Sequence, residues 1–194
     1  MPAGFEELAA VVAARLETDG RAVVGIDGPC GAGKSRLAGR LAERFPGSAL
    51  FHADDFFLQA RQRTKERLSE PGGNMDRERL AGEVLEQLKS GRPFTYRRYD
   101  CKSGVLTRVD AAPTRLVIVE GAYCLHPDLQ RYYSLKVFLD APRGVRLERI
   151  ARRNPEQAAR FLSEWIPLED RYFQAFNVRS AADIVLNGLP ESVD

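Results

Sequence analysis

One eight-residue stretch constrains this chain more than any other. Residues 28–35 read Gly-Pro-Cys-Gly-Ala-Gly-Lys-Ser and match the pattern G-x-x-x-x-G-K-[ST] at every specified position. The run 22–27 before them is typical of a buried strand, and Leu37, Ala38 and Leu41 after them recur at helical spacing. A strand, a glycine-rich loop and a helix start together direct backbone N–H groups and a positive dipole end at one place. The stretch therefore predicts a loop that binds the phosphates of a nucleoside triphosphate.

The loop and the first turn of the following helix supply the residues expected to bind the nucleotide. Lys34 adds a positive charge for the β- and γ-phosphates and is also a catalytic candidate, and the Ser35 hydroxyl is placed to bind Mg²⁺. ATP and Mg²⁺ are therefore the expected cofactors. An accidental match in a glycine-rich turn is the alternative, and it leaves the flanking strand and helix unexplained. The expected nucleotide-binding residues are Gly28, Gly31, Ala32, Gly33, Lys34, Ser35 and Arg36.

Composition describes an ordinary globular chain. Its 194 residues suit a single domain, and 44% hydrophobic with 29% charged residues is usual for such domains. A formal net charge of +2 gives no overall attraction to nucleic acid or to a membrane surface. We therefore expect a small-molecule partner, and homo-oligomerisation stays open.

Cysteine usage and the N-terminal region both indicate a cytoplasmic protein. Cysteines in an odd number and in no metal-ligand spacing favour a reducing compartment over a disulfide scaffold. The apolar run from Leu8 to Ala14 is too short to span a bilayer, and Glu6 and Glu7 precede it where a signal peptide would be basic. Its spacing predicts an amphipathic helix that packs on the domain. The cysteines are Cys30, Cys101 and Cys124.

Strand-like apolar segments alternate with segments of helical periodicity along residues 1–194. This order predicts one domain with an α/β, three-layer fold of the P-loop NTPase type, in which helices cover both faces of a five-stranded parallel sheet. The expected strands are 23–27, 49–52, 116–119, 135–139 and 184–186. The expected helices are 36–45, 77–89, 127–133, 143–153 and about 156–176, the last broken near Pro167.

Residues 58–113 interrupt the alternation. They are rich in charge, glycine and proline, and a connection this long inside a compact domain is usually functional or disordered. Such connections overhang the carboxyl ends of the strands, where ligands bind, so we expect an acceptor-binding insertion. A solvated loop is the alternative for part of it. Aromatic and charged residues that alternate here suit a polar ligand. Together with two residues that precede the insertion they form the expected acceptor set: Asp55, Phe57, Tyr96, Arg97, Tyr99 and Asp100.

A second apolar strand ends in an acid. Residues 115–121 read Arg-Leu-Val-Ile-Val-Glu-Gly, the layout of a Walker-B acid that holds Mg²⁺ directly or through water. Aspartate is the common residue at this position, and the longer Glu120 could instead orient a water molecule. A surface glutamate at a strand end is the alternative, and the apolar run before Glu120 argues against it.

Two adjacent aspartates follow the second expected strand. Asp54 and Asp55 should emerge beside the phosphate loop, where bound Mg²⁺ would offset their mutual repulsion. Asp54 is therefore a candidate metal ligand together with Ser35 and Glu120. One aspartate can also serve as the catalytic base, because the loose transition state of phosphoryl transfer needs little proton removal before the new bond forms. An acidic N-cap is the alternative role, and these residues alone leave open which aspartate is the base.

Three arginines follow the fourth expected strand at helical spacing. Arg146, Arg149 and Arg153 share one helix face, which places their guanidinium groups together. Residues 143–163 are therefore expected to form a lid that neutralises charge on the transferred phosphoryl group and excludes water. A solvated helix face, balanced by Glu148, is the alternative.

The order of these motifs resembles a known family. The phosphate loop, residues 54–57 (Asp-Asp-Phe-Phe), residues 119–121 (Val-Glu-Gly) and the lid arginines are similar to the uridine kinase / phosphoribulokinase / pantothenate kinase superfamily of small-molecule kinases. Residues 165–169 (Trp-Ile-Pro-Leu-Glu) resemble the end of bacterial uridine kinase-like proteins. The resemblance extends from Val23 to Leu186. It implies a five-stranded parallel sheet, Asp54 as the base and Glu120 as the Walker-B acid.

One segment departs from the pyrimidine-nucleoside kinases of that superfamily. They carry Pro-x-Tyr-Asp-Phe followed by a histidine that reads the base, whereas residues 93–100 here read Pro-Phe-Thr-Tyr-Arg-Arg-Tyr-Asp. The two histidines, His52 and His126, lie elsewhere. The kinase prediction does not depend on this segment, but the identity of the acceptor does.

The sequence thus predicts an ATP-dependent kinase that phosphorylates a hydroxyl of a small polar metabolite, with a nucleoside as the first candidate. Pantothenate, nicotinamide riboside, a sugar or a sugar phosphate is the alternative acceptor, and Arg97 with Arg98 would favour one that carries a carboxylate or phosphate. A regulatory ATPase or GTPase switch is the alternative from another class. The chain lacks the Asn-Lys-x-Asp sequence of GTPases and the Leu-Ser-Gly-Gly-Gln sequence of ABC-type ATPases.

Overall fold

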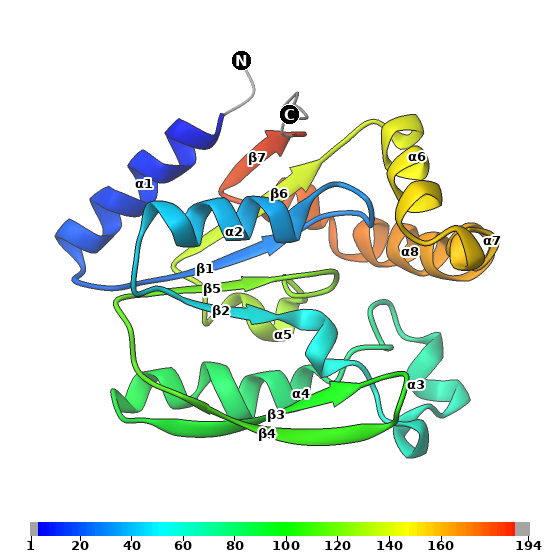
Figure 1. Cartoon of the computed structure of the whole chain (residues 1–194), viewed down its shortest axis with the longest axis horizontal. Coiled ribbons are helices and arrows are strands. Elements are labelled where there is room, and N and C mark those ends of the chain that lie inside the picture. The colour runs from blue at the N-terminus through cyan, green and yellow to red at the C-terminus, as the bar shows by residue number, and fades with distance from the viewer. Residues whose placement is uncertain (1–3, 189–194) are drawn as a thin grey trace.

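A five-stranded parallel sheet organises the computed structural model, which describes residues 4–188 (Figure 1). Its strand order is β2-β5-β1-β6-β7, and every neighbouring pair is parallel. The expected α/β architecture is confirmed, and each strand lies within one residue of its expected bounds. The strands are β1 (Ala22–Asp27), β2 (Ala49–His52), β5 (Leu116–Glu120), β6 (Leu135–Asp140) and β7 (Ile184–Asn187).

Helices cover both faces of the sheet because its central strands are buried at consecutive positions, so that both faces carry apolar side chains. On one face, Ile118 of β5 packs in a cluster with α1 (Phe5–Thr18) and α2 (Lys34–Arg44). On the other face, its neighbours in β5, Val117 and Val119, pack in a cluster with residues of the short helix α5 (Pro127–Gln130) and of α8 (Ile166–Phe176). The predicted amphipathic helix at the N-terminus is α1, which lies beside α2 (Figure 1). Within residues 4–188, no helix is both long and apolar enough to cross a membrane.

Three helical expectations needed correction. The helix expected over 127–133 ends at Gln130, after one turn. The helix expected over 77–89 consists of α4 (Arg77–Leu80), a π-helical turn and a 3₁₀ turn that ends at Ser90. The chain does not break at Pro167, because a π-helical turn over Phe161–Trp165 leads into α8, with Pro167 in its first turn. A proline there removes only an N–H group that has little use at the start of a helix.

The segment expected to form a lid begins with α6 (Arg143–Arg153), continues through a 3₁₀ turn and α7 (Ala158–Arg160), and leads through that π turn into α8. Behind α8 the chain forms the short helix α9 (Val178–Ala181) and then β7. Figure 1 shows α6, α7 and the start of α8 at one end of the sheet, beyond the carboxyl end of β1. The residues that follow β1 and β6 therefore meet in this region.

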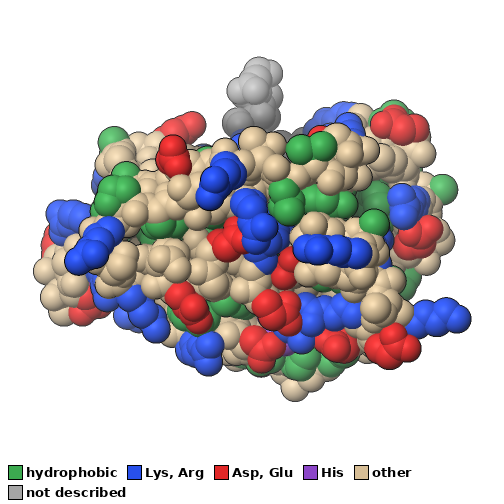
Figure 2. Space-filling view, turned by 90° about the horizontal axis from the view of Figure 1, so that it is seen from below, with side chains coloured by type: hydrophobic (Ala, Val, Ile, Leu, Met, Phe, Trp, Pro, Cys, Tyr) green, Lys and Arg blue, Asp and Glu red, His purple; other side chains and the backbone are tan. Residues whose placement is uncertain are grey.

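The insertion contains a β-hairpin that the sequence reasoning missed. Strand β3 (Phe94–Asp100) pairs with β4 (Val105–Ala111) in antiparallel order as a separate two-stranded sheet. The hairpin lies below β2 in Figure 1, and α3 (Lys65–Ser69) and α4 lie near it. Tyr96 and Arg98 share one face of β3 and Arg97 and Tyr99 the other, so aromatic and charged side chains occur on both faces of the strand. Acidic and basic side chains are mixed on the lower surface of the molecule (Figure 2).

Candidate active site

The phosphate loop joins β1 to α2 and depends on its glycines. Gly33 precedes α2 in a left-handed conformation with φ of 101°. A Cβ atom at Gly28 would lie 2.1 Å from the carbonyl oxygen of Leu139 on β6, and one at Gly31 would lie 2.7 Å from that of Arg146 on α6. The loop therefore fits only because these positions lack side chains.

Lys34 lies against the loop that it follows. Its Nζ donates hydrogen bonds to the carbonyl oxygens of Gly28 at 2.7 Å and Pro29 at 3.2 Å. The N–H groups of Lys34 and Ser35 open α2 and have no preceding helical turn to accept them. Ser35 and Arg36 are exposed in this first turn, whereas Ala32 is buried and donates its N–H group to Pro29. A charged amine and a helix N-terminus thus meet where a phosphate would bind.

A fully buried carboxylate, which sequence reasoning did not single out, lies beneath the loop. Asp27 ends β1 and accepts hydrogen bonds from the N–H groups of Gly28 at 2.7 Å and Leu125 at 3.0 Å, and from the Tyr172 hydroxyl at 2.9 Å. Burial raises the pKa of Asp27 to about 6, although these hydrogen bonds and the charge of Lys34 oppose the shift. Its position directly before the glycine motif was the available signal.

Three titratable side chains meet at the carboxyl ends of β2 and β5. His52 and Glu120 end these strands in register, and His52 Nδ1 lies 2.6 Å from Glu120 Oε1. This hydrogen bond raises the pKa of His52. Asp54 follows in a 3₁₀ turn, Ala53–Phe56, where desolvation raises its pKa, the charge of Lys34 lowers it and that of Glu120 raises it. Asp54, Glu120 and Lys34 are thus close enough for their charges to interact.

The oxygen groups here suit Mg²⁺ in chemical type. Mg²⁺ prefers oxygen ligands, and in nucleotide enzymes one or two carboxylates usually share it with substrate phosphates and water. The Ser35 hydroxyl and the carboxylates of Asp54 and Glu120 provide such a set beside Lys34. Among residues 4–188, no group of three or more His, Cys, Asp or Glu side chains is arranged to hold a metal ion by itself. The residues therefore fit an ion whose remaining ligands come from the nucleotide and water.

On the acceptor side, the structure pairs Asp55 with Arg98 rather than with Arg97. Arg98 Nε lies 3.0 Å from Asp55 Oδ2. Arg97 lies on the other face of β3 and pairs with Glu83 through its side chain and its N–H group. Because successive residues of a strand face opposite ways, Arg97 and Arg98 do not share one partner.

The other expected acceptor residues are spread over different environments. Tyr96 is buried and packs edge-on against Phe51, with ring centroids 5.2 Å apart. Phe57 and Tyr99 are half-buried. Asp100 closes the hairpin turn, where its carboxylate accepts hydrogen bonds from the Lys102 N–H group and the Ser103 hydroxyl. Asp55 and Arg98 are therefore joined, whereas Arg97 and Asp100 are engaged elsewhere.

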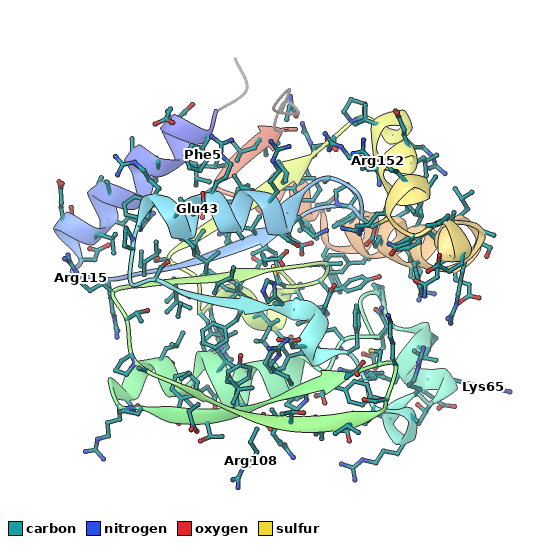
Figure 3. The ribbon with its side chains drawn as sticks, in the orientation of Figure 1. Phe5, Glu43, Lys65, Arg108, Arg115 and Arg152 are labelled. Atoms are coloured by element: carbon teal, nitrogen blue, oxygen red, sulfur yellow. The ribbon has the colours of Figure 1, made fainter. Side chains whose placement is uncertain are left out.

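A buried arginine that sequence reasoning missed holds this region together. Arg79 of α4 is 7% exposed and stacks over the Phe56 ring. Its guanidinium donates to the carbonyl oxygens of Asp55 at 3.0 Å and Arg97 at 2.5 Å, and it pairs with Asp76. It thus ties the turn that carries Asp54 to the hairpin. In the sequence it is indistinguishable from any arginine on an amphipathic helix. Figure 3 shows that Arg108, by contrast, points away from the hairpin.

Two of the three expected lid arginines reach the phosphate loop. Arg146 is buried and its Nη1 lies 3.4 Å from the carbonyl oxygen of Cys30. Arg149 Nη1 lies 3.3 Å from that of Gly31. Arg153 is exposed at the end of α6. The helix is therefore docked on the loop through Arg146 and Arg149.

Comparison with known proteins identifies the family. Residues 23–160 match the model of the Phosphoribulokinase / Uridine kinase family. The chain belongs to this family. It is 31% identical over 157 residues to Uridine-cytidine kinase C of Dictyostelium discoideum, a match that covers 76% of this chain and 33% of that protein. It is 27% identical over 145 residues to Uridine kinase of Borreliella burgdorferi strain ZS7, covering 71% of this chain and 69% of that one.

A solved structure supports the same fold. The structure of a possible uridine kinase from Bacillus stearothermophilus aligns with a TM-score of 0.71 and 22% identity, over 94% of this chain and 96% of that one. The chain spans about a quarter to a third of the length of the first curated relatives that it matches. The family match thus agrees with the family that the sequence motifs resemble.

Proposed function

We propose that this protein is an ATP-dependent small-molecule kinase that transfers the γ-phosphoryl group of ATP to a hydroxyl of a nucleoside, with Asp54 as the base. The observation that carries the proposal is the meeting of Lys34, Glu120 and Asp54 beside the Asp55–Arg98 pair. Asp54 would then lie between the groups that bind the nucleotide and those that bind the acceptor. The names of the uridine kinase and uridine-cytidine kinase relatives favour a nucleoside.

The nucleotide would be held by the loop and the metal by its neighbours. Lys34 and the N–H groups that open α2 would bind phosphate oxygens, and Ser35, Glu120 and Asp54 would hold Mg²⁺. The ion, when bound, would neutralise charge on the β- and γ-phosphates. Arg146 and Arg149 contact the loop from α6, so residues 143–163 would act as the lid that adds positive charge and excludes water. Arg153, at the exposed end of α6, would contribute least.

Asp54 suits the base better than Asp55 does. Asp55 is paired with Arg98, whereas Asp54 lies near Lys34 and Glu120. A raised pKa also makes the Asp54 carboxylate a somewhat stronger proton acceptor than an ordinary aspartate. Asp54 would accept the proton of the acceptor hydroxyl as the bond to phosphorus forms.

The charge state of the acceptor side favours a neutral substrate. Arg98 and Asp55 form a pair with no net charge, and the carboxylate and guanidinium can together bind the hydroxyls of a sugar ring. A second candidate is an acceptor that already carries a phosphate or carboxylate. It rests on the exposure of Arg98, whose side chain is 53% exposed and could bind an anion in place of Asp55.

An acceptor panel tests the proposal directly. Purified protein with Mg²⁺ and ATP is incubated with uridine, cytidine, nicotinamide riboside, pantothenate, ribose or ribose 5-phosphate, and the phosphorylated product is detected by mass spectrometry. We expect a nucleoside monophosphate and little ADP without an acceptor. Steady ADP release without an acceptor, and no product with any of them, would instead indicate a nucleotide hydrolase or switch.

Arg98→Gln separates the two classes of acceptor. Loss of the guanidinium should lower kcat/KM strongly for an anionic acceptor, because a charged partner disappears. For a nucleoside the loss should be smaller, and Arg97→Gln on the opposite face of β3 is the matched control. A wild-type preference for ribose 5-phosphate or pantothenate over the nucleosides, abolished in Arg98→Gln but kept in Arg97→Gln, would replace the nucleoside proposal with the anionic one.

A further inference from the structure

A buried carboxylate on the distant helix α8 accepts a hydrogen bond from the backbone of the phosphate loop. Glu169 lies on α8, and its Oε2 accepts a hydrogen bond of 2.8 Å from the N–H group of Cys30, 139 residues away in the sequence. Glu169 is 5% exposed. An acid beside an anion-binding loop is unfavourable for phosphate binding by charge alone, so its presence there needs a compensating role.

Both backbone polar groups of Cys30 are engaged by the helices that follow β6. Glu169 of α8 accepts from its N–H group, and Arg146 of α6 donates to its carbonyl oxygen at 3.4 Å. Burial raises the pKa of Glu169, while the charges of Lys34 and Arg146 oppose that rise. Arg146 and Lys34 thus offset the negative charge that Glu169 brings to the loop.

Hydrogen bonds within the protein occupy alternate amides of the loop. The N–H groups of Gly28, Cys30 and Ala32 bond to Asp27, Glu169 and Pro29, respectively. Such a loop binds an anion in the concavity that its free N–H groups form, so fixing these three amides restricts the loop conformation on which that concavity depends. A loop whose N–H groups are set before binding loses less entropy when the triphosphate arrives.

Helix α8 also contacts Asp27, which lies beneath the phosphate loop, and the first part of the insertion. The Tyr172 hydroxyl, one turn after Glu169, bonds to Asp27. The guanidinium of Arg171 donates to the carbonyl oxygen of Leu68 at 2.9 Å, in the insertion's helix α3. A change in the position of α8 would therefore reach the phosphate loop through Glu169.

We propose that Glu169 is a positioning residue for phosphoryl transfer, which orients the phosphate loop through the Cys30 N–H group. The inference depends on ATP binding by this chain and is independent of the acceptor. Glutamine keeps an oxygen acceptor at the same reach, whereas methionine keeps the length and bulk but offers no comparable acceptor. Glu169→Gln and Glu169→Met therefore form a matched pair. Asp170→Ala, an exposed neighbour that pairs with Arg143, is the control.

Calorimetric titration with Mg·ATP measures the effect without any acceptor. Because a hydrogen bond to a charged group is strong and the loop amide would lose its partner, Glu169→Met should weaken ATP binding about tenfold or more. Glu169→Gln should stay within a few-fold of wild type, and Asp170→Ala should match it. Hydrogen exchange of the peptide over residues 28–33 should be faster in Glu169→Met than in Glu169→Gln.

Two outcomes would overturn the proposal. One is wild-type ATP affinity in Glu169→Met. The other is an equal loss in Glu169→Gln and Glu169→Met, because a lost acceptor could not then be the cause. Thermal unfolding of each variant identifies a folding defect. If Glu169→Met does not fold, Glu169→Gln alone tests the proposal. Near wild-type ATP affinity together with rapid hydrogen exchange over 28–33 in that variant would refute the proposal. Failure of these tests would leave the acceptor panel unaffected.

Discussion

Replacement of Asp27 by asparagine should make the protein relatively more stable as the pH rises from acidic to neutral. Asp27 is fully buried, and burial raises its pKa from 3.8 to about 6 in the folded state. In the unfolded chain the carboxyl returns to its ordinary value. Between these two values the folded state binds a proton that the unfolded state has released.

The sign follows from this difference in bound protons. Because the folded state holds more protons, the contribution of Asp27 to the free energy of unfolding is greatest below its unfolded pKa and falls as the pH rises through the folded one. A shift of about two units corresponds to about 3 kcal/mol in full, of which about 2 kcal/mol falls between about pH 4.5 and pH 7. No discount for solvent screening applies, since the carboxyl is fully buried.

Urea unfolding of wild type and Asp27→Asn at several pH values measures this term, because all other titrating groups cancel in the difference. Asparagine cannot satisfy both N–H donors, so a constant loss is expected at every pH. On top of it, wild type minus variant should fall by about 2 kcal/mol from about pH 4.5 to about pH 7. Tyr172→Phe removes a hydrogen bond that lowers the pKa of Asp27. In this variant the pH range over which Asp27 loses its stabilising contribution should therefore extend to higher pH. A difference independent of pH would refute the reasoning.

The remaining predictions concern catalysis. Lys34→Ala should abolish phosphoryl transfer and leave the unfolding temperature nearly unchanged, because the amine bonds to loop carbonyls rather than to the core; near wild-type turnover would exclude its role. Asp54→Asn should lower kcat by ~10²–10⁴-fold, the usual contribution of a positioned base, and Asp55→Asn should lower it less. The reverse order in a coupled ADP assay would assign the base to Asp55. Hydrogen exchange over 143–161 should slow with a non-hydrolysable ATP analogue, and unchanged exchange would contradict closure of this segment as a lid.

The sequence by itself determined the features that depend on neighbouring residues. The glycine loop, the strand before it and the helix after it follow from local patterns, and so do the five strands of the sheet. Once the strands are known to be parallel, their carboxyl ends must share one edge, which brings Asp54 and Glu120 into the same region as the loop. Local pattern failed for the hairpin, because Tyr96 and Tyr99 are three residues apart and do not follow the period of two that marks a strand.

Only the tertiary structure decided which partners these side chains have. Arg98 meets Asp55 while Arg97 turns to Glu83, and that choice depends on which face of β3 packs against the domain. Glu169 meets Cys30 across 139 residues. No local preference encodes such a contact, because hydrogen bonds between distant segments form only after hydrophobic packing has fixed the relative positions of the helices and the sheet.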